Sequence, residues 1–390
     1  MSSPQAPWPL YPGDEIEAVA AILRSGKVNY WTGSVGREFE KAYADYLSVK
    51  HAIAVANGTV ALDLAWHALG LKHGDEVIVT SRTFLASVSS IVLAGAVPVF
   101  VDIDRETQNT PPETIRAAIT AKTKAILCVH LAGWPCEMDG IMALAREHDL
   151  KVVEDCAQAH GARYRDRPVG SFGDIAAFSF CQDKIMTTGG EGGLVACNDD
   201  ALWSLMWSFK DHGKSFDAVY HREHPAGFRW VHESFGTNWR LTEMQSAIGL
   251  VQLGKLDAWV SQRRANATAL LSELQDLPAL RIPQVPAHIY HAMYRAYAFV
   301  RPECLRADWS RDRIIQAINE VDVPCMVGSC SEVYLEKAFE GTGFAPAERL
   351  PVARELGDTS LAFLVHPTLS VEQCREAGAR IRDVVQKATA

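Results

Sequence analysis

The sequence lacks the features that place a protein in a membrane or in an oxidising compartment. A membrane-spanning helix needs about 18 consecutive apolar residues, and no apolar run in the sequence approaches this length. The start, Met-Ser-Ser-Pro-Gln-Ala-Pro-Trp, has neither the basic nor the apolar region of a secretory signal peptide. The nine cysteines form no C-x-x-C pair and no metal-ligand pattern. We therefore expect a cytoplasmic protein with reduced thiols, no membrane contact and no bound metal ion.

Positive charge is also scarce. Lysine and arginine number 38 against 47 aspartates and glutamates, which gives a formal net charge of -9. This balance disfavours nucleic acid as the main partner, so an anionic ligand has to be held by local cations. With 390 residues, 48% of them hydrophobic, the chain can bury a large core and is predicted to form two domains.

A single lysine separates a strand-like run from a glycine-rich stretch. Residues 178–193 read Phe-Ser-Phe-Cys-Gln-Asp-Lys-Ile-Met-Thr-Thr-Gly-Gly-Glu-Gly-Gly, and Lys184 is the only lysine between Lys151 and Lys210. A lysine amine forms a Schiff base with pyridoxal phosphate only when it is partly deprotonated, so we expect a setting that lowers the pKa of Lys184. Ser179 is placed to face an anion. The alternative is an exposed loop lysine in a tight turn.

A carboxylate follows the second of two apolar runs that begin at Ile126 and Val152. Both runs read as buried parallel strands, and Asp155 falls at the carboxyl end of the second, where open α/β sheets place ligands. A carboxylate beside the pyridine nitrogen keeps that nitrogen protonated. Ala157 offers a small surface for the ring, and Gln158 can reach the ring hydroxyl. The alternative for Asp155 is the N-cap of a helix.

Two strand-to-helix junctions complete the pattern. At the first, Asn-Gly-Thr leaves the backbone N–H groups of Gly58 and Thr59 at a helix N-terminus, a place for an anion that Ser179 can also reach. At the second, Phe84 stands between a strand and a helix of a βαβ pattern. There it either stacks on the cofactor ring opposite Ala157 or fills the core under the helix.

The remaining pattern predicts an α/β protein with a large and a small domain. Alternating strands and helices from residue 51 to about 199 predict a doubly wound, mainly parallel sheet. Later segments predict a smaller α+β C-terminal domain, and we divide the chain into domains 1–250 and 251–390. These segments are a helix from 242 to about 274, a strand over 294–300, a helix over 311–321 and a last helix from 371 to about 387, started by a capping box of Ser370 and Gln373.

Six motifs in order resemble the DegT/StrS family of sugar-nucleotide aminotransferases, which have the aspartate aminotransferase fold, fold type I of the pyridoxal-phosphate enzymes. The resemblance runs from about residue 10 to about residue 385. It is specific because the motifs stand in the right order at plausible separations. The motifs are Asn-Gly-Thr, Thr-Phe-x-Ala-Ser, Glu-Asp-x-Ala-Gln, Ser-Phe-x-x-x-Lys, Gly-Glu-Gly-Gly and Gly-x-Asn-x-Arg-x-x-Glu-x-Gln.

The resemblance implies a role for each matching residue. Lys184 inherits the bond to pyridoxal phosphate and the acid/base role, and Asp155 inherits the contact to the ring nitrogen. Asn238 matches a residue that reaches the phosphate of the neighbouring subunit's cofactor, which implies a homodimer with shared active sites. The other implied contacts are Phe84 and Ala157 on the ring, Gln158 on the ring oxygen, and Gly58, Thr59 and Ser179 on the phosphate. Substrate contacts are expected from Trp31 and Thr32 in the N-terminal loop, from Arg240, and from His291, for which a place in the core is the alternative.

The implied activity moves an amino group from L-glutamate to a keto carbon of a nucleotide-linked keto-deoxyhexose. Carbon 4 is the expected position, and the amino sugar serves polysaccharide or glycoconjugate synthesis, such as that of lipopolysaccharide. There are three alternatives: amination at carbon 3, another fold-type I activity such as that of an aminohydroxybenzoate synthase or a lyase, and a regulatory role. In one branch of the family a histidine replaces this lysine and the protein is a dehydratase, so Lys184 argues against that branch. Residues 209–213, Phe-Lys-Asp-His-Gly, depart from the usual Arg-x-His-Gly or Arg-x-Tyr-Gly, so their contacts are not carried over.

Overall fold

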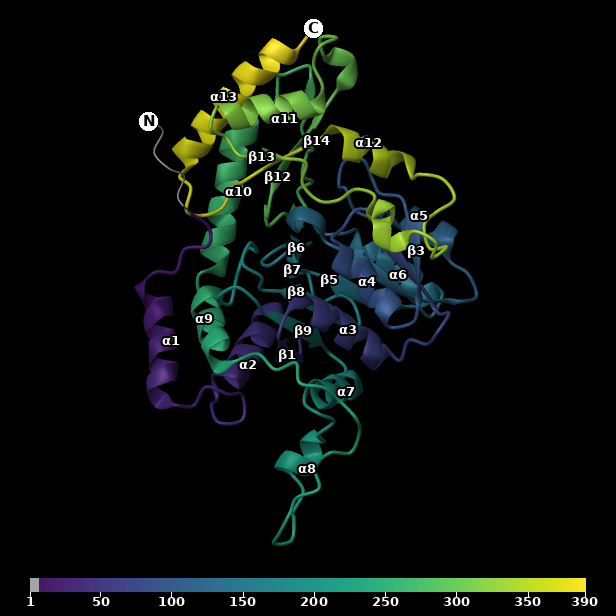
Figure 1. Cartoon of the computed structure of the whole chain (residues 1–390), viewed down its shortest axis with the longest axis vertical. Coiled ribbons are helices and arrows are strands. Elements are labelled where there is room, and N and C mark those ends of the chain that lie inside the picture. Colours follow the sequence, from purple (N-terminus) through teal and green to yellow (C-terminus); the bar gives the residue numbers. More distant parts are fainter. Residues whose placement is uncertain (1–6) are drawn as a thin grey trace.

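A seven-stranded sheet forms the centre of the protein, whose computed structural model describes residues 7–390 (Figure 1). The strand order is β1-β9-β8-β5-β4-β2-β3, in which β9 pairs antiparallel with both neighbours and the other pairs are parallel. The predicted doubly wound, mainly parallel sheet is therefore confirmed. Its strands are β1 His51–Val55, β2 Glu76–Thr80, β3 Val97–Val101, β4 Thr123–Val129, β5 Lys151–Asp155, β8 Ile175–Ser179 and β9 Gly193–Cys197.

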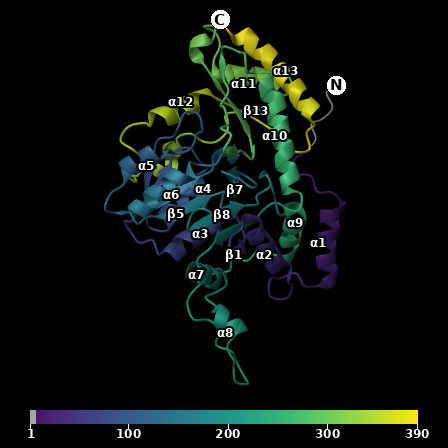
Figure 2. The same ribbon diagram turned by 180° about the vertical axis from the view of Figure 1, so that it is seen from behind.

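Helices cover both faces of this sheet because its strands are apolar on both sides. In β1, Ile53 and Val55 pack with one set of helices, while Ala52 and Ala54 pack with the other, as the two-residue period of a strand requires. Figure 2 shows the arrangement from behind. The first set is α3 Gly58–Leu69, α4 Leu85–Leu93 and α7 Asp200–Lys210, and the second includes α2 Val35–Leu47, α5 Pro112–Ala118 and α6 Met138–Glu147.

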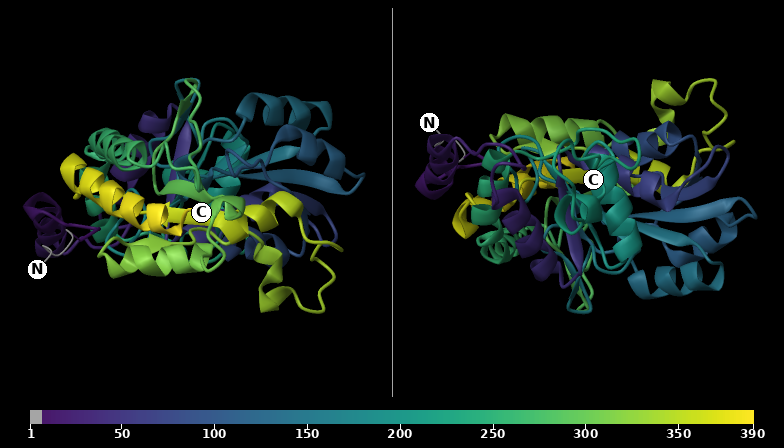
Figure 3. Two further views of the ribbon diagram at one scale, coloured as in Figure 1. Left: turned by 90° about the horizontal axis from the view of Figure 1, so that it is seen from above. Right: turned by 90° about the horizontal axis from the view of Figure 1, so that it is seen from below.

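A second, antiparallel sheet lies in the C-terminal part of the chain, in the order β10-β12-β14-β13. Figure 3 shows this part, coloured from green to yellow, from above and from below. Ala296 and Ala298 of β12 pack toward helices α10, α11 and α13, whereas Tyr297 and Phe299 pack with α12 and with Ile103 and Ala132 of the large part. The α+β character of this part is as predicted. Its elements are β10 Leu280–Arg281, β12 Ala296–Val300, β13 Cys325–Met326, β14 Ser360–Phe363, α10 Leu256–Ser272, α11 Arg311–Glu320, α12 Pro351–Thr359 and α13 Val371–Ala388.

Some residues beyond 250 return to the large part. Strand β11 (Ile289–Tyr290) pairs with β6 (Arg163–Tyr164), which pairs with β7 (Arg167–Pro168). Val333 and Phe339 pack in the core under α3 and α4. The domain boundary at residue 250 stays a prediction. The other elements are α1 Gly13–Ser25, α8 Phe216–Tyr220, α9 Glu243–Leu253 and the 3₁₀ turns Leu131–Gly133, Pro302–Cys304, Val333–Leu335 and Lys337–Phe339.

The single helix predicted from residue 242 to about 274 is wrong, because the structure has two helices there. Helix α9 ends at Leu253 and α10 begins at Leu256. Gly254 is a poor helix former, and the Lys255 ammonium bonds Glu15 of α1 at 2.9 Å. The capping box predicted at Ser370 and Gln373 is present and starts α13, which ends at Ala388.

The segment that contains α8 projects from the body at the end opposite the C-terminal sheet (Figure 1). It carries three aromatic side chains that are largely in solvent, with exposed fractions of 73% for Phe228, 81% for Trp230 and 99% for Phe235. Apolar rings on an extension of this kind suit burial against another surface. No helix within residues 7–390 is long and apolar enough to span a membrane.

A buried carboxylate holds the N-terminal loop to α9. Glu243, in the first turn of α9, accepts hydrogen bonds from the backbone N–H groups of Val35 (2.7 Å) and Gly36 (3.0 Å) at the start of α2. These N–H groups have no partner inside their own helix. A Cβ on Gly36 would lie 2.9 Å from the Glu243 carboxylate, so the close approach needs a glycine. Glu243, which the sequence motif contained without a role, thus fixes the loop that carries residues 30–33.

Replacing this carboxylate by an amide should destabilise the protein. Glu243→Gln puts an NH₂ group against a backbone N–H, and we expect the free energy of unfolding to fall by about 1–3 kcal/mol. Denaturant unfolding followed by circular dichroism measures the change. Glu38→Gln is the matched control, because this exposed carboxylate in the first turn of α2 accepts from the Ser34 hydroxyl and not from backbone N–H groups of the loop. Equal stabilities of the two variants would contradict the assigned role of Glu243.

Candidate active site

A cavity of about 770 Å³ opens where the strands of the large sheet end and the C-terminal sheet approaches. The carboxyl ends of β5 and β8 meet here, as in other open parallel sheets. Eight of the nine residues predicted to bind the cofactor line this cavity, and the ninth, Asn238, does not. The lining residues that matter below are Gly58, Thr59, Phe84, Ser87, Asp155, Ala157, Gln158, Ser179, Asp183, Lys184, Tyr294 and Arg295.

Lys184 lies in the turn that follows β8, with its side chain 17% exposed. Its Nζ atom donates to Asp183 Oδ1 at 3.1 Å. The predicted setting that lowers its pKa is wrong for this structure. Burial by itself lowers the pKa of Lys184, but Tyr294 and Asp183 outweigh burial and raise it. The alternative of an exposed loop lysine is also excluded by this burial.

Asp155 ends β5 and is 6% exposed. Its Oδ2 accepts from the Ser87 hydroxyl at 2.7 Å, and its Oδ1 accepts from the Ala157 N–H at 3.1 Å. Burial raises its pKa, and the hydrogen bond from Ser87 opposes the rise. No helix starts after Asp155, so the alternative of a helix N-cap is wrong. A buried carboxylate of this kind gains most from a cationic partner.

The start of α3 and the end of β8 form one side of the cavity. Asn57 caps α3 by accepting from the Val60 N–H at 3.0 Å, and Gly58 and Thr59 occupy its first turn. A Cβ on Gly58 would lie 2.6 Å from Ser179 Cβ, so only glycine fits there. The helix N-terminus and the Ser179 hydroxyl are thus close enough to hold one anionic group.

Phe84 and Gln158 both present functional groups to the cavity. The Phe84 side chain is 71% exposed and lines the cavity, so the alternative of a core residue under α4 is wrong. Gln158 accepts from the Ala132 N–H at 2.7 Å through its carbonyl oxygen, which leaves its NH₂ group to donate. Ala157 lines the same wall beside Asp155.

A second group of predicted residues lies elsewhere. Asn238 is exposed on the segment before α9 and is joined to Asp211 by a backbone bridge. Arg240 donates to Asp211 at 2.7 Å, and the Lys214 ammonium lies 4.2 Å from the Trp31 ring. Thr32 is exposed next to Trp31. These residues lie together but do not line the cavity of their own chain.

His291 is a core residue. It is 5% exposed, its Nδ1 accepts from the Met293 N–H at 2.9 Å, and its ring lies 5.3 Å from that of Trp134. Burial lowers its pKa to about 3, so it stays neutral. Its position gives no support to a substrate contact and fits the alternative place in the core.

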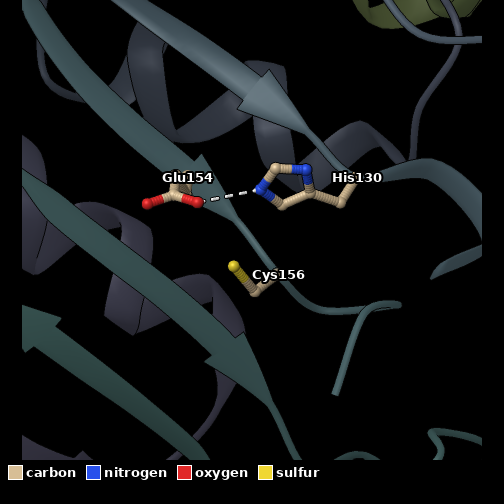
Figure 4. Close-up of side chains that lie close together, drawn as sticks. All are labelled: His130, Glu154 and Cys156. Atoms are coloured by element: carbon tan, nitrogen blue, oxygen red, sulfur yellow. Dashed lines mark hydrogen bonds and ion pairs between the residues drawn. The ribbon is translucent and has the colours of Figure 1, made fainter. Parts of the chain in front are cut away.

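A buried group behind the cavity has the composition of a metal site. Ligand atoms of His130, Glu154 and Cys156 lie within 4.8 Å of one another (Figure 4). The Glu154 oxygens already accept four hydrogen bonds, one from His130 Nε2 at 3.0 Å and three from backbone N–H groups of the 170–173 loop. His130 Nδ1 accepts from the Cys136 N–H at 3.0 Å. The carboxylate and both histidine nitrogens are therefore engaged in hydrogen bonds that stabilise the fold.

Four residues of the cavity were missed by the sequence reasoning. Asp183 stands next to Lys184 and Ser87 ends a quoted motif, so their closeness in sequence was the only available signal. Tyr294 and Arg295 precede β12, far along the chain, and nothing local points to the cavity.

Comparison with known proteins identifies the group to which this site belongs. Residues 11–382 match the model of the DegT/DnrJ/EryC1/StrS aminotransferase family. The chain belongs to this family. The predicted family, fold and enzyme class are thereby confirmed.

Three relatives show how close the similarity is. GDP-perosamine synthase of Escherichia coli O157:H7 is 36% identical over 94% of both chains. The dTDP-3-amino-3,4,6-trideoxy-alpha-D-glucose transaminase of Streptomyces venezuelae is 35% identical over 95% of this chain and 90% of its own. A crystal structure of an aminotransferase from Psychrobacter cryohalolentis is 54% identical, covers 99% of this chain and all of its own, and superposes with a TM-score of 0.97.

The cofactor of this aminotransferase is pyridoxal phosphate. The cavity fits it, because it combines a lysine amine, a buried carboxylate, an exposed aromatic ring and a helix N-terminus beside a serine. Lys184 would hold the aldehyde carbon, Asp155 the ring nitrogen, and Gly58, Thr59 and Ser179 the phosphate.

Removing the charge of Asp155 should weaken the chemistry more than the binding. Asp155→Asn keeps the size of the side chain, and the phosphate contacts remain. Each unit by which the pKa of the ring nitrogen falls corresponds to about 1.4 kcal/mol, and we expect single-turnover rates with glutamate to drop at least about tenfold. Asp200→Asn, at an exposed ion pair with Lys50, is the control. Wild-type rates for Asp155→Asn would show that the carboxylate has only a structural role.

Proposed function

We propose that this aminotransferase transfers the amino group of L-glutamate to the C4 keto carbon of a nucleotide-linked keto-deoxyhexose. Support comes from the cavity that unites Lys184 and Asp155 and from the 36% identity to GDP-perosamine synthase over 94% of the chain. The product would be a nucleotide-linked amino sugar for polysaccharide or glycoconjugate synthesis.

Two residues carry the proton and charge chemistry in this proposal. When bound, the cofactor accepts the amino group and delocalises the electron pair released at the donor's α-carbon. The Lys184 Nζ atom takes the proton from that carbon and later returns a proton to the sugar carbon. Asp155 keeps the ring nitrogen charged, and the Ser87 hydroxyl orients Asp155.

Amination at carbon 3 is the second candidate, because the Streptomyces venezuelae relative, at 35% identity, is named for a 3-amino sugar. The two candidates use the same lysine and carboxylate and differ in how the sugar is turned. A synthase of the aminohydroxybenzoate type, a lyase or a regulatory protein would not require a nucleotide-linked sugar. Turnover of such a sugar therefore separates our proposal from these alternatives.

The decisive experiment offers purified protein a panel of nucleotide-linked 4-keto and 3-keto deoxyhexoses with L-glutamate. Mass spectrometry should detect an amino sugar from a 4-keto substrate, and NMR of the product gives the aminated carbon. Lys184→Ala should be colourless and inactive, because no other lysine lies between Lys151 and Lys210. Borohydride reduction with peptide mapping should label Lys184. Label on another lysine, or turnover of no nucleotide sugar, would contradict the proposal.

We propose further that two copies of the chain share their active sites. Asn238 is exposed and absent from its own cavity, although the family motif gives it a cofactor contact. The neighbouring segment carries exposed Phe228, Trp230 and Phe235, which suit burial against a second copy. In such a dimer, Trp31, Thr32 and Arg240 would approach the partner's substrate.

Mixed dimers test the shared site. Lys184→Ala and Asn238→Asp, the latter setting a negative charge against the phosphate, should each be nearly inactive alone. In a mixed dimer, one site collects both lesions and the other has none, so random re-association should restore about a quarter of wild-type activity by symmetry counting. No gain, although mixed dimers are shown to form, would mean that Asn238 serves its own subunit.

We also propose a cytoplasmic location. All nine cysteines are free of disulfide bonds, and several, such as Cys128, Cys156 and Cys197, are buried in the core. The reaction would then take place where nucleotide-linked sugars are made.

A further inference from the structure

The carboxylate of Asp183 joins two parts of the protein at the reactive lysine. Its Oδ1 accepts from Lys184 Nζ at 3.1 Å, and its Oδ2 accepts from the Tyr294 hydroxyl. Tyr294 is 8% exposed and precedes β12 of the C-terminal sheet. Each carboxylate oxygen thus has its own partner, one on each side of the cavity.

The local backbone explains how two consecutive side chains come together. The Lys184 N–H donates to the Cys181 carbonyl at 3.1 Å, which closes a turn with Asp183 inside it. In an extended strand, consecutive side chains point to opposite faces and would not meet. Trp8 Nε1 donates to the Lys184 carbonyl at 2.9 Å and holds the main chain of the same residue.

The groups around the amine include its proposed acceptor. Asp183 and Cys181 face the amine from its own turn, Tyr294 from the segment before β12, Asp155 from β5 and His160 from the segment after β5. The Arg295 guanidinium lies 4.0 Å from Asp183. Burial raises the pKa of Asp183, but Lys184, Tyr294 and Arg295 outweigh burial and lower it, so the carboxylate is ionised at neutral pH.

We propose that Asp183 is a positioning residue that holds the Lys184 amine whenever the amine is not bonded to the cofactor, with Tyr294 fixing Asp183 from the C-terminal part. The proposal rests on the role assigned to Lys184 under the proposed function. The lysine must leave the cofactor and return to it in each half-reaction. A flexible four-carbon side chain loses conformational freedom each time it is brought back, and a fixed acceptor restricts that freedom in advance.

An ordinary surface ion pair is the competing explanation, and such pairs contribute little. The exposed pair of Lys41 and Asp45, 2.7 Å apart on α2, is of that kind and supplies a matched control. The Asp183 pair differs because the lysine is mostly buried and because the second oxygen is bound by a buried tyrosine.

The first measurement is a pH titration of the free Lys184 amine in holoenzyme that L-glutamate has converted to the aminated form, followed through the rate at which acetic anhydride acylates Lys184. A carboxylate stabilises the protonated form of the lysine nitrogen, so removing its charge lowers the pKa of that nitrogen. We expect Asp183→Asn to shift the titration midpoint down by about one unit. Asp45→Asn should leave the midpoint unchanged.

The second measurement follows the return of the lysine to the cofactor. The holoenzyme is first converted with L-glutamate, and 2-oxoglutarate is then added in a stopped-flow instrument while absorbance is recorded. Asp183→Asn and Tyr294→Phe should slow this return by about tenfold, with the KM for glutamate unchanged. Tyr294→Phe keeps the aromatic ring and carries the test if Asp183→Asn does not fold.

These outcomes are separate from those of the proposed function because no sugar is used. Wild-type titration and wild-type return in both variants would overturn the proposal even if a nucleotide sugar is turned over. Conversely, a shifted midpoint and a slowed return would support it even if every sugar in the panel is rejected. Borohydride label on a lysine other than Lys184 would remove its basis.

Discussion

The parallel pairing of β5 with β8 is the constraint on which the site depends. In this register, Asp155 lies beside Ala177, two residues before Ser179, and β4 places Val129 on its other side. Because parallel strands end at the same edge of the sheet, the carboxylate, the serine and the lysine turn open into one cavity. The other residues that line the cavity, from the start of α3 to the segment before β12, lie around this edge.

The sequence predicted those parts of the structure in which the signal is local. Continuous apolar runs predicted the buried strands, and junction residues such as Gly58 and Asp155 stand where strands end, so their convergence followed from parallel topology. The break between α9 and α10 was missed because apolar residues keep helical spacing across Gly254, while the contact of Lys255 with α1 is a tertiary feature. The same limit hid Tyr294, which approaches the cavity from the C-terminal part.

The predicted electrostatics failed for the same reason. Burial alone lowers the pKa of a lysine, and that part of the expectation for Lys184 was sound. A neighbouring carboxylate reverses the effect, and whether consecutive side chains meet depends on the turn that closes at Cys181. For His291, the sequence left open whether the side chain reaches the substrate or packs in the core, and its burial fits the core.

The two carboxylates that end β5 have opposite tasks. Glu154 points away from the cavity and accepts from four donors, three of them backbone N–H groups of the 170–173 loop and the fourth His130, whereas Asp155 points into the cavity and accepts from two donors. A slip of β5 by one residue during folding would exchange them and leave three backbone N–H groups of that loop without an acceptor. The loop thus selects the register of β5, because its backbone N–H groups find their acceptor only when Glu154 faces the loop and Asp155 faces the cavity.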